Sequence, residues 1–187
     1  MSRSGARVQL TLIAAVFAVP LLLAAWMYYS DAGLTPAGRT NHGALLEPIE
    51  NLNRQRPGFS DELAAGRWAM VYVNDASCDD ACREALYRMR QSRLMLGNDM
   101  TRMARIFLHG DRPPDRVFLD REHAGLHTTS DDALRELLER KRPEDLPPGG
   151  IYLVDPLGNL VMYFAAGLDP EDMVEDIEHL LDLSRIG

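Results

Sequence analysis

The chain has 187 residues, 46% of them hydrophobic and 26% charged, with two cysteines and a formal net charge of −8. This composition is typical of a globular protein with room for one ordinary domain and an appendage, and two cysteines are too few for a small fold stapled by disulfides. The acidic balance, 18 basic against 28 acidic residues beyond position 29, argues against nucleic acid as a partner.

The first feature along the chain is an uncharged apolar segment at residues 8–29. It is long enough to cross a bilayer as a helix, which needs about 20 residues. Arg3 and Arg7 precede it, so the positive-inside rule keeps this end in the cytoplasm and exports the rest of the chain. A cleaved signal peptide is the alternative, but the apolar run exceeds a normal signal core and ends in bulky residues. Residues 1–29 are therefore predicted to be a cytoplasmic stub and a transmembrane anchor.

The next segment, residues 30–67, is rich in Gly, Pro, Asn and Arg and has no sustained periodicity. This predicts a linker and entry segment, with a short strand at 44–46 as its one candidate element. Order is expected to begin at Trp68, where the run "WAMVYV" has the length and composition of a buried strand. Residues 68–187 are predicted to form a single domain.

A strand–helix–strand unit opens this domain. After the strand at 68–73, apolar residues at helical spacing predict a helix that continues to Leu96, with Gly97 as its stop signal. The run "MARIFLH" at 103–109 predicts the second strand. Such a unit places its two strands parallel, with a right-handed crossover.

The second half of the domain is predicted from chain breakers and helix caps. Residues 110–129 contain "DRPPDR" and are expected to form a loop. Two apolar runs around "DPLGN" predict an antiparallel hairpin. The predicted elements are a helix over 130–140, strands over 151–154 and 160–164, and a last helix with Asp169 as N-cap and Pro170 in its first turn.

The two cysteines, Cys78 and Cys82, lie in "NDASCDDACREAL", between the first strand and its helix. Residues i and i+4 of a helix have Cα atoms about 6 Å apart, which suits a disulfide and also lets two thiolates hold one metal ion. The helix N-terminus favours thiolate, whereas Asp79 and Asp80 oppose it. In an oxidising compartment the pair closes unless a metal or a reductant holds it open. The pair is predicted to be redox-active, metal-binding or both, with a static disulfide or two buried thiols as the alternative.

The order βαβαββα, with both cysteines in the first strand-to-helix loop, resembles the thioredoxin fold over residues 68–185. The sequence thus predicts an α/β, thioredoxin-like domain preceded by one transmembrane helix. With three residues between the cysteines, a membrane anchor and the stretch "YLVDPLGNLVMYF", the chain further resembles the Sco family of cytochrome c oxidase assembly proteins.

The resemblance to the Sco family implies site residues, partners and a cellular location. Members of that family bind copper through two cysteines and a distant histidine and help to mature the copper site of oxidase subunit II, as copper donors or as thiol reductants. By matching, Cys78 and Cys82 take the cysteine roles. The implied partners are a cytochrome c oxidase subunit or other oxidase assembly factors. The implied location is the cytoplasmic (inner) membrane of a bacterium, with a single span and the C-terminal domain in the periplasm.

The family's histidine does not carry over, because the chain has "EDLPPGGIYLVD" at that place, with Pro147 near the aligned position. Cu(I) prefers soft thiolates and tolerates two of them, so copper binding with a replacement ligand stays open. His109 is the candidate ligand, because it ends the second strand at the sheet edge that carries the cysteine loop. His42 would have to fold back over the site from the entry segment.

These features predict an oxidase assembly factor that acts mainly by thiol–disulfide exchange. Cys78, the more exposed cysteine, would attack a partner disulfide and Cys82 would resolve the mixed disulfide. The first alternative is a metallochaperone that holds Cu(I) between the two sulfurs and delivers it to the oxidase. The second is a scaffold that keeps the fold without the chemistry. No cofactor other than copper is indicated.

Overall fold

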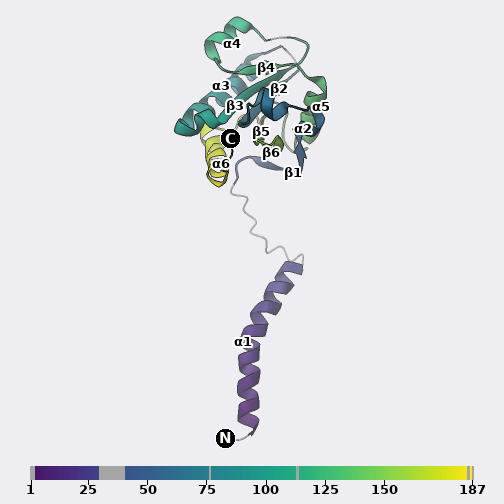
Figure 1. Ribbon diagram of the computed structural model, residues 1–187, viewed down its shortest axis with the longest axis vertical. Coiled ribbons are helices and arrows are strands. Elements are labelled where there is room, and N and C mark those ends of the chain that lie inside the picture. The colour runs from purple at the N-terminus through teal and green to yellow at the C-terminus, as the bar shows by residue number, and fades with distance from the viewer. Residues whose placement is uncertain (1–2, 30–40, 76, 113, 185, 187) are drawn as a thin grey trace. The chain divides into compact units, whose positions relative to one another are not determined.

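The computed structural model describes residues 3–29, 41–75, 77–112, 114–184 and 186 (Figure 1). The chain divides into two compact units, Met1–Thr40 and Asn41–Gly187. The first contains helix α1 (Arg3–Tyr29), and the second contains all the other helices and strands of the described residues.

Helix α1 has the length and composition of a membrane span. Its stretch Arg7–Trp26 is 20 residues long, and none of it is buried inside the structure. Pro20 lies within the helix, as membrane helices tolerate. The predicted N-terminal apolar helix is therefore confirmed as an element.

The second unit is built on a six-stranded mixed sheet in the order β1-β6-β5-β2-β3-β4. Strands β2, β3 and β4 are parallel, whereas β5, β6 and β1 follow one another antiparallel. The parallel pairing of the strand–helix–strand segment and the antiparallel C-terminal hairpin are thus as predicted. The strands are β1 (Ala44–Asn51), β2 (Trp68–Asn74), β3 (Met103–His109), β4 (His127–Thr129), β5 (Ile151–Val154) and β6 (Asn159–Phe164).

Helices cover both faces of the sheet and enclose two apolar cores (Figure 1). Alternation along β3 sends Met103 and Phe107 into the first core and Ile106 into the second, because successive side chains of a strand point to opposite faces. The first core is closed by α3 (Asp80–Met95) and α6 (Pro170–Leu183). The second is closed by α2 (Leu52–Gln55), the π-helical turn η1 (Phe59–Leu63) and α5 (Asp132–Lys141). A 3-10 turn, η2 (Gly97–Arg102), joins α3 to β3.

The folded unit begins earlier than the expected start at Trp68. Strand β1 is an edge strand paired with β6, and Leu52 and Phe59 are completely buried in the second core. The short strand predicted at 44–46 is confirmed as the first part of β1, which continues to Asn51. Edge strands carry polar residues and proline on their exposed side, and "LEPIEN" therefore lacks the apolar run that revealed β2. Only part of the predicted linker, residues 30–40, lies outside the folded unit, and also outside the described residues.

The expected loop at 110–129 contains two elements. Helix α4 (Arg116–Glu122) begins at Asp115, whose side chain accepts a hydrogen bond from the Val117 amide at 2.9 Å. Strand β4 pairs with β3 at the sheet edge. Both are short, and the prolines before α4 dominated the local pattern, so neither was predicted.

Candidate redox site

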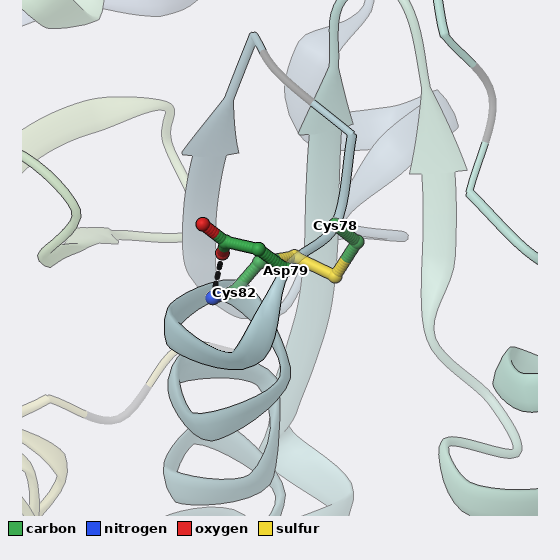
Figure 2. The surroundings of a disulfide bond; sticks show 3 residues. All are labelled: Cys78, Asp79 and Cys82. Carbon is green, nitrogen blue, oxygen red and sulfur yellow. Dashed lines mark hydrogen bonds between the residues drawn. A yellow bond between two sulfur atoms is a disulfide. The ribbon is translucent and has the colours of Figure 1, made fainter.

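The site lies where β2 and β3 end at the same edge of the sheet. Asn74 is the register partner of His109, and the Gly110 amide donates to the Asn74 carbonyl at 3.2 Å. The chain then turns into α3, whose N-cap is Asp79. The Asp79 carboxylate accepts from the Cys82 amide at 3.0 Å (Figure 2), a capping contact that supplies an acceptor to a helix N-terminus.

Cys78 and Cys82 are joined by a disulfide bond across this corner, with their Cα atoms 5.1 Å apart (Figure 2). Cys82 lies on the buried face of α3 and is 0% exposed. Cys78 is half-buried, at the edge of the first core. The two residues therefore differ in access, because Cys82 has no exposed surface and Cys78 keeps part of its surface exposed.

The surroundings of the disulfide combine acidic and buried phenolic groups. Asp79 and Asp80 are exposed beside it. Tyr72, on β2, is 4% exposed and shares the first core with Cys82. Burial, and secondarily the charge of Asp79, raise the pKa of Tyr72 to about 12, so the phenol is neutral at ordinary pH.

A hollow of about 350 Å³ lies alongside the first turns of α3. Its helical wall combines the small Ala81 and Ala85 with the charged Glu84 and Arg88. The loop before β5 closes it with Pro148 and Gly149. Tyr72 also lines it. The hollow thus lies beside Ala81, the chain neighbour of Cys82, and has no charged group on its loop side.

That loop is held from behind by Tyr163, on β6. The Tyr163 hydroxyl donates to the Pro147 carbonyl at 2.6 Å and accepts from the Gly150 amide at 3.0 Å. Pro147 and Pro148 both follow trans peptide bonds, since the one cis bond among the described residues is Glu47–Pro48. Sequence reasoning missed Tyr163, although a tyrosine in a mostly apolar strand signals a hydroxyl that needs a partner.

The two histidines considered as copper ligands lie apart in the fold: His109 ends β3, whereas His42 precedes β1. The Nδ1 of His109 donates to the Gly110 carbonyl at 2.7 Å, which leaves Nε2 as the lone-pair nitrogen of the neutral ring. His42 instead contacts α6, with its ring nitrogens 3.6 Å from Asp172 and 3.2 Å from Glu175. His42 therefore does not fold back over the site.

The site offers a copper ion the two cysteine sulfurs without a third ligand grouped beside them in the described part of the chain. Within the described part of the chain, no three His, Cys, Asp or Glu side chains are grouped so that they could hold a metal. At the expected place of a third ligand, Pro147 offers only its carbonyl, which Tyr163 occupies. When reduced, the pair alone suits two-coordinate Cu(I), which accepts two soft thiolates.

Comparison with known proteins gives a family and a fold. The family described as "Transmembrane-like, thioredoxin-like, C-terminal domain" matches residues 68–184. No curated protein matches the chain by sequence.

Three solved structures share the fold. Copper-bound ScoI from Arabidopsis thaliana aligns with a TM-score of 0.52 and 16% identity, covering 64% of this chain and 86% of that one. Copper-bound yeast Sco1 gives 0.51 and 19%, covering 64% and 78%. Apo Sco1 from Thermus thermophilus gives 0.53 and 17%, covering 77% and 99%. The predicted thioredoxin-like fold and the predicted likeness to Sco proteins are thus confirmed at the level of fold.

Proposed function

This chain belongs to the family of transmembrane-like, thioredoxin-like C-terminal domains, and on that premise we propose that it is a membrane-anchored thiol–disulfide oxidoreductase that assists assembly of cytochrome c oxidase. Helix α1 is the anchor, in the cytoplasmic membrane of a bacterium, and the folded unit works in the periplasm. The Sco-like fold supports the choice of an oxidase subunit, or another oxidase assembly factor, as partner.

One observation carries the proposed chemistry: the disulfide couples a fully buried cysteine to a half-buried one. Thiol–disulfide exchange proceeds through a mixed disulfide and needs one attacking cysteine with access to the partner and one resolving cysteine behind it. Half-buried Cys78 suits the first role, and buried Cys82 suits the second.

In the reducing direction, the Cys78 thiolate attacks one sulfur of the partner's disulfide. The partner's S–S bond breaks, its other sulfur leaves as a thiolate and takes a proton from water, and a mixed disulfide forms. The Cys82 thiolate then attacks the Cys78 sulfur and releases the partner's second thiolate. Two electrons pass to the partner and this chain ends as the Cys78–Cys82 disulfide, which a thiol reductant of the same compartment reduces again.

The test is to trap the mixed disulfide with the full-length chain in membranes. Cys82→Ser removes the resolving thiol and should accumulate a covalent adduct with an oxidase subunit or assembly factor, seen on non-reducing gels. Cys78→Ser is the matched control and should trap nothing. If both variants trap alike, or if cells with both substitutions assemble oxidase normally, the exchange role is wrong and the chain is a scaffold.

A second candidate function is carriage of Cu(I) as cargo between the two reduced sulfurs. The cysteine pair of this chain and its likeness in fold to copper-bound Sco structures favour it. Competition titration of the reduced full-length chain measures the affinity. Sub-picomolar binding that is lost in Cys78→Ser would favour the copper carrier over the oxidoreductase. A further loss in His109→Ala would identify His109 as third ligand.

A further inference from the structure

We infer that Tyr163 is a positioning residue for exchange with polypeptide disulfides, acting by holding the loop 147–150 against the first turns of α3. The inference rests on the proposed function and adds to it a residue outside the reactive pair. Its basis is geometric: the hydroxyl of a buried tyrosine ties together the two ends of the loop that bounds the hollow beside the first turns of α3.

The hydroxyl of Tyr163 makes two contacts that the loop cannot replace. It donates to the Pro147 carbonyl at 2.6 Å and accepts from the Gly150 amide at 3.0 Å, and Tyr163 itself is 0% exposed. The Gly150 amide is buried, whereas Pro147 is exposed and its carbonyl can turn to water. A phenylalanine at position 163 would therefore leave the buried Gly150 amide without its partner. Such a group is costly enough to make the backbone move instead.

The loop has little freedom of its own once the hydroxyl is in place. Gly149 has φ +86°, a conformation that favours glycine. A Cβ on Gly150 would clash with the Phe164 carbonyl oxygen and with the Tyr163 ring, so the backbone lies directly on β6 there. The path of Pro148 and Gly149 along the hollow is thus set by one glycine conformation, one close backbone approach and the Tyr163 bridge.

The hollow adjoins α3, the helix that begins two residues after Cys78. Its loop wall faces Ala81 and Ala85, which flank buried Cys82, and the charged Glu84 and Arg88 line the same side. A disulfide within a polypeptide must bring its flanking chain up to this corner, whereas a small disulfide needs only the sulfur of Cys78. Displacement of the loop should therefore slow exchange with a peptide disulfide and leave exchange with a small disulfide unchanged.

Tyr152 provides a matched control on the neighbouring strand β5. It is equally buried, its ring centroid lies 4.8 Å from that of Tyr163, and its hydroxyl donates to the Leu138 carbonyl at 2.8 Å, at the end of α5 and away from the loop. Tyr152→Phe and Tyr163→Phe remove the same atom from the same core. Only Tyr163→Phe removes hydrogen bonds to the loop 147–150.

The experiment uses the reduced full-length chain in detergent with two probes: dithionitrobenzoate, and a cysteine-containing peptide as its mixed disulfide with thionitrobenzoate. In each case the protein dithiol becomes the Cys78–Cys82 disulfide, the probe disulfide becomes two thiols, and released thionitrobenzoate is followed by absorbance. Tyr163→Phe should slow the peptide reaction about tenfold, the scale of a small misplacement of a positioning group. Tyr163→Phe should leave the rate with dithionitrobenzoate and the reduction potential unchanged. Tyr152→Phe should change neither of these, nor the rate with the peptide.

Equal peptide rates in Tyr163→Phe and the wild type would overturn the inference, and so would an equal loss with both probes. If Tyr163→Phe fails to fold, Pro148→Gly loosens the same loop with the hydroxyl intact and must reproduce the peptide-specific loss, or the inference falls. Failure of the wild type to exchange with either probe would instead overturn the proposed function. Wild-type exchange without a difference between the variants overturns the positioning role alone.

Discussion

Asp79 places a carboxylate between the two cysteines and occupies the Cys82 amide at 3.0 Å. A Cys78 thiolate at the start of α3 would draw on that same donor. Because the donor is taken and the carboxylate adds negative charge, the thiolate is disfavoured and the disulfide is stabilised relative to the dithiol. The pair should therefore be a reductant rather than an oxidant.

This argument predicts that Asp79→Ala raises the reduction potential by about 10–20 mV, which corresponds to about 0.5–1 kcal/mol. Asp80→Ala removes the same charge from the first turn but leaves the Asp79 cap in place, and should shift the potential less. Equilibration with a glutathione redox buffer measures both. Equal shifts in the two variants would show that the occupied amide has no effect.

A second residue-scale prediction concerns His123, which is 3% exposed beside the ring of Phe118. Burial, with Arg90 and Arg105 nearby, lowers its pKa to about 4. Between pH 6.5 and 4 the imidazole of His123 is therefore protonated in the unfolded chain and neutral in the folded chain. The free energy of unfolding then decreases as the pH falls, by at most about 1.4 kcal/mol per unit and about 3 kcal/mol over the window.

Replacement of His123 by Gln removes this linkage. Urea unfolding of the full-length chain at pH 7, 6 and 5 should show a clear loss of stability towards acid in the wild type and a shallower loss in His123→Gln. Parallel pH dependence of the two proteins would contradict the assignment of a neutral, buried imidazole.

At the scale of elements, the start of the folded unit is held to α6 by one buried carboxylate. Asp176 is 6% exposed and accepts from the amides of His42 and Gly43, at 3.2 and 2.8 Å. Gly43 has no room for a side chain, because a Cβ would lie 2.6 Å from the sulfur of Met162. These contacts align the chain to enter β1, and they join residues 133 and 134 positions apart.

Asp176→Ala should therefore lower the free energy of unfolding by about 1–3 kcal/mol, since two amides lose a buried acceptor. Asp172→Ala is the control, because its carboxylate meets the His42 ring at 3.6 Å with 39% of the side chain exposed, and such surface pairs contribute about 0–1 kcal/mol. Denaturant unfolding compares the two. A larger loss from Asp172→Ala would mean that the ring contact, rather than the capped backbone, holds the segment.

At the scale of the whole molecule, the extent of the folded unit decides which fragment can fold. Residues 41–67 supply β1 and the buried Leu52 and Phe59 of the second core. Without them, β6 becomes an open edge and the second core keeps only α5 as its cover, which favours unfolding and aggregation. We expect a fragment of residues 41–187 to unfold cooperatively and a fragment of 68–187 to be insoluble or partly folded.

Circular dichroism and gel filtration of the two fragments check this expectation. The cysteine corner is present in both, so reactivity of the thiols alone does not distinguish them. A soluble, cooperative fragment of 68–187 would restore the original boundary at Trp68.

The elements that were predicted correctly from the sequence are those whose residues are mostly buried or that carry clear helix caps. Strands β2, β3 and β5 are buried on both faces and read as continuous apolar runs, and α6 carries a cap, a proline and a clear apolar stripe, so all were predicted. Strand β1 lies at an edge of the sheet and is mostly exposed or half-buried, whereas α4 and β4 are only seven and three residues long. Elements of that kind leave little periodic signal, because few of their residues are buried.

The sequence by itself determined the apolar N-terminal helix, the thioredoxin-like order of elements and the approach of two cysteines at a strand-to-helix corner, because each of these is written in local spacing. The sequence also predicted Cys78 as the more exposed cysteine. Only the tertiary structure decided that Cys82 is completely buried, that His42 contacts α6, and that Tyr163 holds the loop that faces the first turns of α3. Those features depend on contacts between segments distant in the chain, and burial and hydrogen bonding across such distances arise only when the whole sheet and its helices pack together.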